Sequence, residues 1–192
     1  MRLDSVRPVH VGDVLVEGEP WPGYLHAIEH PGGRILVDTG MIDSTPELDE
    51  DWHPFYDADA IPRIVRCVIN THLHFDHCGG NRLFAGVPIH VQRAELETAS
   101  APDYLMEWVE FEGATYVELD GAAEIVPGVR VLPTPGHTPG HQSVLVETED
   151  GLVVVAGDVA YRWEDFDAAG GAILALEPRR IWLAHEVAPR DA

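Results

Sequence analysis

Apolar positions recur along the chain in short runs rich in Val and Ile, separated by Gly, Pro and Asp. Short, β-branched runs bounded by turn residues are typical of buried strands. They predict strands at residues 9–16, 21–29, 34–37, 64–69, 88–91, 115–119, 122–126, 129–132, 143–148, 152–156 and 181–184. Apolar residues at helical spacing instead predict helices at 92–111 and near 164–176, and a short helix is expected at Asn81–Ala85.

Two distant segments share a turn, an apolar strand and a terminal aspartate: Gly33–Asp38 and Gly151–Asp158. We interpret them as parts of two related halves, each a sheet with helices outside, that pack sheet to sheet. A cleft would then run along the strand ends. Because the chain has 192 residues and no low-complexity linker, one domain spanning residues 1–192 is expected.

The segment 41–61 has no clear period and carries the aromatic residues Trp52, Phe55 and Tyr56. Loops of this length in compact domains are usually functional. The segment leaves the sheet after Asp38, near the strand ends. We therefore expect its three aromatic side chains to line the entrance to a site and to bind substrate.

Four potential metal ligands lie close together after the strand at 64–69: His72, His74, Asp76 and His77. Residues two apart in extended chain point the same way, so His72 and His74 can hold one ion together. The Gly-Gly pair that follows allows a sharp turn, from which Asp76 and His77 can reach a second ion. This ligand set suits zinc or a neighbouring first-row metal, whereas a histidine-rich surface turn would account for only one or two of the four.

Three further candidates, His137, Asp158 and His185, each follow an apolar strand or lie in a rigid turn. Each alone is weak evidence, since an isolated histidine is more often a surface or core residue. Together with the first four they make seven groups, too many for one tetrahedral ion. Two ions about 3.5–4 Å apart would use them all, with one carboxylate bridging.

The charge balance excludes several classes of partner and of chemistry. Acidic residues number 33 and basic residues 12, which gives a net charge of −21. Such a surface repels nucleic acid and anionic membranes, so a small-molecule substrate is expected. Every basic residue is Arg and none is Lys, which excludes lysine-based covalent catalysis.

Neither secretion nor a membrane span is indicated, because the N-terminus has no apolar h-region and no run approaches 18 apolar residues. Two cysteines, Cys67 and Cys78, do not make a disulfide framework, and a cytoplasmic location is expected. We expect Cys78 to fill space beside the site rather than to bind metal. The sequence is compatible with a homodimer.

The pattern H-x-H-x-D-H at 72–77, followed by separate His, Asp and His ligands, resembles the hallmark of the metallo-β-lactamase superfamily. The resemblance implies an α/β (α+β) fold, an αββα sandwich of two mixed sheets flanked by helices. It also implies the ligand sets: His72, His74 and His137 for one metal, Asp76, His77 and His185 for the other, and Asp158 as the bridge. Asp38 matches a position that supports the metal-binding loop from behind.

Within the superfamily, the chain most resembles the N-acyl-homoserine lactonases. The similarity lies in the segments Thr71–Asn81, Ile89–Glu95, Val126–Val129 and Thr134–Ser143. It also includes Tyr161, because these lactonases carry a Tyr three residues after the bridging Asp. The chain departs from that pattern in a trimmed N-terminal region and a short segment between Asp158 and His185, and both regions contribute to the pocket.

The resemblance implies a hydrolase in which a metal-bridging hydroxide opens the ring of an acyl-homoserine lactone. Two divalent ions, Zn²⁺ or alternatively Fe, Mn or Co, would stabilise hydroxide near neutral pH. We expect Asp76 to carry the proton to the leaving alkoxide and Tyr161 to hydrogen-bond the developing oxyanion.

The sequence also allows other hypotheses about the function. A sister hydrolase acting on β-lactams, thioesters or phosphodiesters is the second hypothesis. A redox protein of the diiron flavoprotein kind is a third, although it would call for a carboxylate where His74 stands. A non-catalytic binding module would be expected to lack some of the seven ligands.

Overall fold

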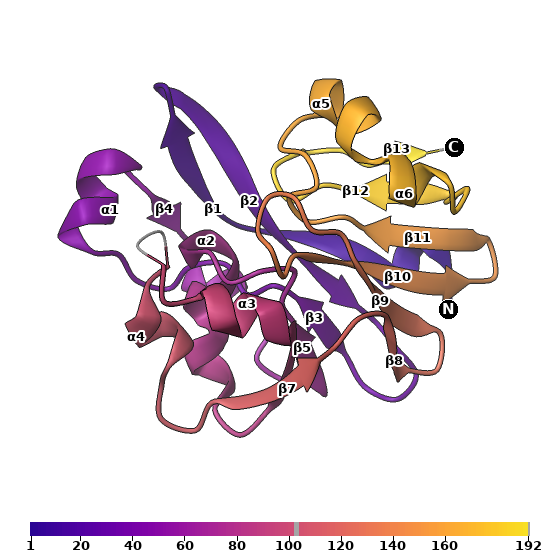
Figure 1. Ribbon diagram of the computed structural model, residues 1–192, viewed down its shortest axis with the longest axis horizontal. Helices are drawn as coiled ribbons and strands as arrows, with labels where there is room; N and C mark the ends of the chain where they lie inside the picture. Colours follow the sequence, from indigo (N-terminus) through magenta and orange to yellow (C-terminus); the bar gives the residue numbers. More distant parts are fainter. Residues whose placement is uncertain (102–103, 192) are drawn as a thin grey trace.

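The strands of the computed structural model form two mixed sheets in the part of the chain that it describes, residues 1–101 and 104–191. The sheets face each other, and helices cover their outer faces (Figure 1). The layers therefore run helix, sheet, sheet, helix, which is the αββα sandwich predicted from the sequence.

The first sheet contains Val6–Val16 (β1), Glu19–Ile28 (β2), Ile35–Val37 (β3), Phe55–Tyr56 (β4), Cys67–Ile69 (β5), Pro88–Gln92 (β6) and Thr115–Leu119 (β7). Their order is β4-β1-β2-β3-β5-β6-β7. β1 and β2 form a long antiparallel hairpin, and β3, β5, β6 and β7 are parallel. The carboxyl ends of these parallel strands consequently lie at one edge of the sheet.

The second sheet contains Ala123–Val126 (β8), Val129–Pro133 (β9), Gln142–Thr148 (β10), Gly151–Val155 (β11), Arg180–Trp182 (β12) and Arg190–Asp191 (β13). Their order is β13-β12-β11-β10-β9-β8. β8 to β11 form an antiparallel meander, whereas β12 is parallel to β11. β11 and β12 therefore also end at a common edge.

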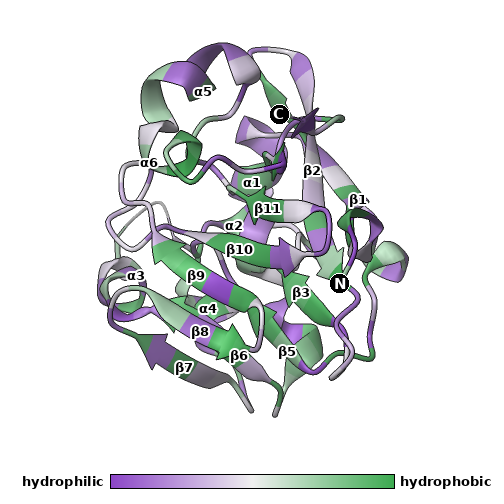
Figure 2. Ribbon diagram, turned by 90° about the vertical axis from the view of Figure 1, so that its right-hand side faces the viewer, coloured by the Kyte–Doolittle hydropathy of each residue, from purple (hydrophilic) through white to green (hydrophobic). Residues whose placement is uncertain are grey.

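The strand β3 shows why the central strands are unbroken apolar runs in the sequence. Ile35 and Val37 are fully buried between the sheets, in one cluster with Val144 and Val153 of the second sheet. Leu36 points the other way and is fully buried in a separate outer cluster. A strand covered on both faces has no place for a polar side chain. Figure 2 shows the same character in β3, β10 and β11, which are largely green.

The helices are short: Leu3–Ser5 (η1), Pro46–Asp51 (α1), Ala58–Ala60 (η2), Phe75–Cys78 (α2), Gly79–Phe84 (η3), Arg93–Thr98 (α3), Met106–Val109 (α4), Trp163–Ala169 (α5) and Gly171–Leu174 (α6). Phe84 of η3 packs on the outer side of the first sheet. Phe166 of α5 and Ile173 of α6 pack on the outer side of the second sheet. Because such short helices are unstable alone, these apolar contacts hold them in place.

The predicted strand at 64–69 begins only at Cys67, and Ile64 is 88% exposed. Beyond the pairing of β5 with the three-residue strand β3, one further bond follows, from the backbone N–H of Arg66 to the oxygen of Arg34 at 2.7 Å. The segment 41–61 is more regular than expected. It contains α1, which begins with a hydrogen bond from Leu48 N to the hydroxyl of Thr45, and β4, which pairs with β1.

The two long predicted helices are interrupted. The one at 92–111 is resolved into α3 and α4, and its residues 102–103 lie outside the described part of the chain. The one near 164–176 is divided into α5 and α6 at Gly170 and Gly171, consistent with the low helix propensity of glycine. The short helix expected at Asn81–Ala85 is a 3₁₀ helix that begins at Gly79.

Within residues 1–101 and 104–191, no helix has the length and apolar character needed to cross a membrane. Cys67 and Cys78 are buried free thiols. Burial raises the pKa of Cys67 to about 11 and also raises that of Cys78, so neither is a ready nucleophile or metal ligand. The Cys78 thiol donates instead to the backbone oxygen of Leu73 at 3.2 Å.

Candidate metal centre

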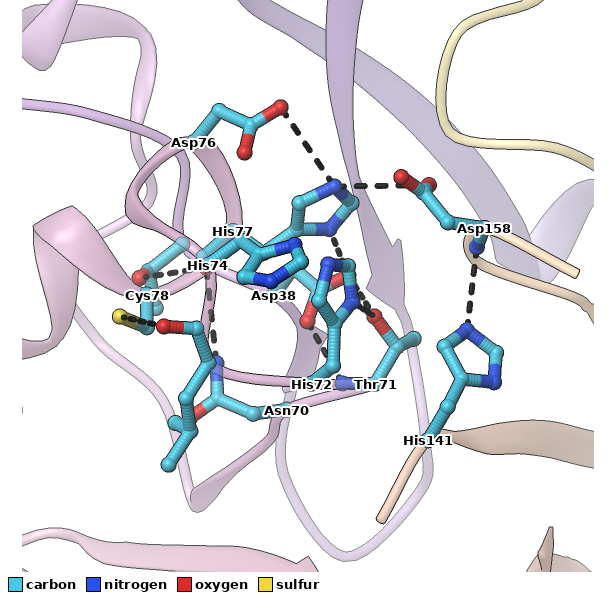
Figure 3. A network of polar contacts seen from close by, with 12 residues as sticks. Asp38, Asn70, Thr71, His72, His74, Asp76, His77, Cys78, His141 and Asp158 are labelled. Carbon is cyan, nitrogen blue, oxygen red and sulfur yellow. Dashed lines mark hydrogen bonds and ion pairs between the residues drawn. The ribbon is translucent and has the colours of Figure 1, made fainter. Parts of the chain in front are cut away.

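The seven predicted ligands converge from strand ends of both sheets. His72, His74, Asp76 and His77 follow β5, His137 lies between β9 and β10, and Asp158 and His185 follow β11 and β12. We call these seven residues the ligand cluster. Because parallel strands end at a common edge, residues distant in sequence meet there, as Figure 3 shows for Asp76, His77 and Asp158.

Three imidazoles form the first group of the cluster. The Nε2 atom of His137 lies 3.1 Å from Nε2 of His72 and 2.9 Å from Nδ1 of His74. The potential ligand atoms of the three residues all lie within 4.8 Å of one another. The group is the set predicted for one metal ion.

Asp76, His77 and His185 form the second group, again with potential ligand atoms within 4.8 Å of one another. Oδ2 of Asp76 is 3.6 Å from Nε2 of His77 and 3.6 Å from Nε2 of His185. Asp158 lies between the groups: its Oδ2 is 3.4 Å from Nε2 of His185 and 3.6 Å from Nε2 of His137. It is placed where a bridging carboxylate would be.

The donor set fits divalent metal ions. Zn–N bonds of about 2.0–2.1 Å place tetrahedral ligand atoms about 3.4 Å apart, close to the spacings in both groups. In addition, Nε2 of His77 and Oδ1 of Asp158 are buried, lie 3.4 Å apart as an ion pair, and have no hydrogen-bond partner among the described residues. Buried polar atoms without partners are costly, and a cation between them would remove that cost.

Hydrogen bonds behind the histidines fix which ring nitrogen faces the centre. Asp38 Oδ2 accepts from Nδ1 of His77 at 2.9 Å, and Thr71 Oγ1 donates to the same carboxylate at 2.8 Å. With its own proton so engaged, Thr71 Oγ1 accepts from Nδ1 of His72 at 3.1 Å. The Nε2 atoms of both histidines therefore face the centre, and in the neutral ring each can bind metal.

Asp38 is held in a strained backbone conformation. Its φ is +63°, in the left-handed region that side-chain-bearing residues seldom adopt. The turn directs its carboxylate at Thr71 and His77, with a further bond of 2.7 Å from the backbone N–H of Thr71. The sequence prediction that Asp38 supports the metal-binding loop corresponds to these contacts.

His185 and Asp158 are anchored by residues from other segments of the chain. His185 Nδ1 donates to the backbone oxygen of Pro22 at 3.0 Å, which turns Nε2 toward the centre. His141 Nδ1 donates to the backbone oxygen of Thr134 at 3.0 Å, so its Nε2 accepts from the backbone N–H of Asp158 at 3.1 Å (Figure 3). A side chain at Gly157 would collide with His141 and Thr71, and its φ of +58° also favours glycine.

The buried charges of the cluster compensate one another. Burial raises the pKa of Asp158, but His77 and His185 outweigh this effect and hold it well below its usual value. Burial lowers the pKa of His77, but Asp158, Asp76 and Asp38 hold it well above its usual value. A bound metal ion would take over this compensation and displace the histidine protons.

A pocket of about 240 Å³ opens onto the ligand cluster. Its apolar side, which we call the pocket wall, consists of Val14, Val16, Trp21, Trp52 and Phe75. Trp52 thus lies where the sequence led us to expect it, 37% exposed and with its ring 5.7 Å from that of Phe75. Phe55 lines a smaller neighbouring cavity, and Tyr56 lines neither.

Most of the pocket wall was not predicted from the sequence: Val14, Val16, Trp21 and Phe75 are new. Trp21 pairs with Val14 across the β1–β2 hairpin, whose two-residue turn has positive φ at Glu17 and Gly18. The alternation in β1 and the Glu-Gly turn were signals that could have placed Trp21 and Val14 on one face. The adjacency of Phe75 to His74 was a second such signal.

Tyr161 stands at the mouth of the pocket. Its hydroxyl is 3.1 Å from Nδ1 of His137, and its ring contacts that of Trp21 at 5.4 Å. Burial, together with the charges of Asp158 and Asp76, raises the pKa of Tyr161, so the hydroxyl keeps its proton at neutral pH. On its other side, a second hollow of about 580 Å³ extends between Pro135 and α5–α6.

Comparison with known proteins agrees with this geometry. The sequence pattern of the metallo-beta-lactamase superfamily matches residues 18–185. An N-acyl homoserine lactonase from a Bacillus species is 39% identical over 181 residues, covering 82% of this chain and 72% of the relative. The N-acyl homoserine lactonase AttM of Rhizobium radiobacter is 30% identical, covering 76% and 68%.

Solved structures give the same result. A variant of AiiA from B. thuringiensis with N-decanoyl-L-homoserine at its active site has a TM-score of 0.83 and 28% identity, covering 97% of this chain and 95% of that one. An N-acyl homoserine lactone hydrolase with N-hexanoyl-L-homoserine at its catalytic metal centre has a TM-score of 0.79 and 29% identity, covering 95% and 92%. The chain therefore belongs to the metallo-beta-lactamase superfamily and is a hydrolase related to the N-acyl homoserine lactonases.

Proposed function

We propose that the protein hydrolyses the lactone ring of N-acyl homoserine lactones with two divalent metal ions, most simply Zn²⁺. The observation that carries this proposal is the position of Tyr161, whose hydroxyl lies beside His137 at the point where an apolar pocket opens onto seven converging ligands. The names and bound products of the related proteins support the same substrate class.

In this proposal, His72, His74 and His137 hold one ion, Asp76, His77 and His185 hold the other, and Asp158 bridges. Metal ions held there would supply Lewis-acid polarisation of the lactone carbonyl and activation of water. Asp76 and Asp158 would offset part of the ions' positive charge.

Tyr161 is suited to stabilise charge on the lactone carbonyl oxygen. For Nε2 of His137 to bind metal, the proton of that ring must be on Nδ1, which then donates to the Tyr161 oxygen. The phenolic proton stays free to donate to the substrate as negative charge develops. The raised pKa of Tyr161 keeps that proton in place.

Asp76 is suited to carry the proton to the leaving alcohol. Both Asp76 and Asp158 line the pocket, but the side chain of Asp76 is 17% exposed and that of Asp158 is 3% exposed. A carboxylate that faces both the cluster and the substrate space can receive a proton from water and pass it to the ring oxygen. The pocket wall would meanwhile cover the acyl chain.

A substrate panel tests the proposal. The zinc-loaded protein should open acyl homoserine lactones of several chain lengths, measured by acid release, with kcat/KM at least about 100-fold above that for a β-lactam, a thioester or a phosphodiester. A preference for one of these other substrates, or no turnover of any lactone at full metal occupancy, would contradict it.

A further inference from the structure

Glu95 is a fully buried carboxylate that the proposed reaction does not use. It lies on α3 and accepts four hydrogen bonds. The donors are the backbone N–H of Leu73 (2.9 Å), the hydroxyl of Tyr104 (2.9 Å), the hydroxyl of Thr138 (2.6 Å) and the backbone N–H of Gly140 (3.1 Å). A carboxylate offers about four acceptor sites, so its capacity is filled.

The partners of Glu95 flank the ligands of one group only. Leu73 lies between His72 and His74, and Thr138 directly follows His137. One carboxylate therefore ties together the two chain segments that supply all three imidazoles of the first group. These segments are about 65 residues apart in sequence and, in the described structure, each is bonded to a different oxygen of Glu95.

The second group is anchored elsewhere. Its His77 is held by Asp38, and its His185 is held by the backbone oxygen of Pro22. Asp38 also reaches the first group, because Thr71 connects it to His72. Glu95, in contrast, bonds only to the segments that carry the first group and to Tyr104.

The backbone at Gly140 shows how closely the supporting parts fit. A Cβ at this position would collide with the backbone N and Cα of Glu95. The absence of a side chain lets the turn after His137 lie directly on the start of α3. The bonds from Thr138 and Gly140 to Glu95 Oε2 then fix that turn on the helix.

We propose that Glu95 is a positioning residue that sets the metal affinity of the site formed by His72, His74 and His137, and not that of the second site. The proposal rests on the proposed dinuclear function. Removing a residue that orients metal ligands typically costs about 10–100-fold in metal affinity. In Glu95→Gln one carboxylate oxygen becomes an NH₂ donor, which would face donors of the chain and loosen the first group alone.

The experiment measures Zn²⁺ affinity by competition with a chromophoric chelator in two reference variants. His185→Ala leaves the first group complete, whereas His137→Ala leaves the second group complete. Adding Glu95→Gln should raise the Kd about 10–100-fold in the first background and less than about threefold in the second. An equal change in both backgrounds, or no change in the first, would overturn the proposal.

Two further variants provide a control and a second test. Glu97→Gln changes an exposed residue of the same helix and should leave both affinities unchanged. Thr138→Val removes only the shortest of the four bonds, and in the His185→Ala background it should raise the Kd by about three- to tenfold. If Glu95→Gln does not fold, as judged by circular dichroism, an unchanged Kd in folded Thr138→Val would reject the proposal.

The zinc stoichiometry of the wild type tests the dinuclear function separately. Binding of one ion only would count against that function whatever Glu95 does. Two ions in the wild type without a site-selective loss in the variant would reject only the role of Glu95.

Discussion

The ligand cluster and the pocket wall lie against each other, but they are built by different means. In the cluster, hydrogen bonds fix the histidine rings. His77 donates to Asp38, and His185 donates to the backbone oxygen of Pro22. In the wall, Trp21, Trp52 and Phe75 are held by packing, and Trp52 remains 37% exposed.

This difference indicates separate roles for the two regions, catalysis for the cluster and substrate preference for the wall. Catalytic groups must be held within a fraction of an ångström, which buried polar contacts between strand ends achieve. An apolar wall at the surface can change shape at little cost in stability. Changes in the cluster should therefore affect every substrate, whereas changes in the wall should alter only which substrates are preferred.

The largest effect is expected from Asp158→Ala. Because both proposed ions would bind to this carboxylate, the variant should lose most of its metal, and lactone turnover should fall by at least about 100-fold. Elemental analysis and kinetics on the same preparation check this. Glu164→Ala, at an exposed acid on α5, is the matched control and should behave as wild type. Full metal content in Asp158→Ala would rule out a bridging role.

Asp38→Asn should have the next largest effect. The amide cannot accept all the hydrogen bonds that Thr71 and His77 now donate, so His77 loses its fixed orientation. Metal affinity of the second group should drop about 10–100-fold. Zinc competition in the His137→Ala background measures this directly, and wild-type affinity there would show that the carboxylate is dispensable.

Tyr161→Phe should keep the fold and both metals, because the ring still packs against Trp21. We expect kcat to fall about tenfold, less than the 10²–10³ typical of losing an oxyanion donor, because a metal ion would share the task. Turnover is compared with wild type at equal metal content. An unchanged kcat would mean that Tyr161 only packs, and the substrate assignment would then lose its main support.

Smaller effects are expected in the wall. Trp21→Ala and Trp52→Ala should each raise KM more for long acyl chains than for short ones, since a fully buried CH₂ contributes about 0.8 kcal/mol, or up to about fourfold. The measurement is kcat/KM across a series of chain lengths, with metal content as the control. Should KM rise equally for all lengths, the wall would not be the acyl site.

The smallest effect on activity is expected at His26, which belongs to neither region. It is buried against Trp182, and burial lowers its pKa to about 3. The unfolded chain binds a proton below about pH 6.5 and the folded chain does not, so the free energy of unfolding falls as the pH drops below that value.

Between pH 8 and pH 5 this one residue should lower the free energy of unfolding by about 2 kcal/mol. His26→Leu should lack that loss and keep normal turnover at pH 8. Urea unfolding of both proteins at the two pH values provides the test. An identical pH dependence in the two proteins would show that His26 is not buried in its neutral form.

The sequence predicted the cluster far better than the wall. The ligands follow strand ends that short apolar runs mark clearly, and a compact motif supplies four of the seven. Trp21 reaches the pocket only through the register of the hairpin, where it lies opposite Val14, and register depends on a partner strand. The segment Ile89–Glu95 was recognised as similar to the lactonases, but the role of Glu95 was not predicted, because its bonds reach Leu73, Thr138 and Gly140, far from it in sequence.

The helices show the same limit. The apolar spacing at 92–111 predicted a helix but not where the helices begin and end. Such short helices are stabilised by packing on the sheet rather than by their intrinsic helix propensity. The strand β5 is likewise shorter than its apolar run, and it pairs with β3 over three residues only.

The most direct test of the account is zinc stoichiometry measured together with lactone hydrolysis on one preparation of the wild-type protein. Metal-free protein would be titrated with Zn²⁺ while turnover of an acyl homoserine lactone is followed. We expect two ions per chain and activity that reaches its maximum only with both bound. Saturation at one ion with full activity, or two bound ions without lactone hydrolysis, would contradict it.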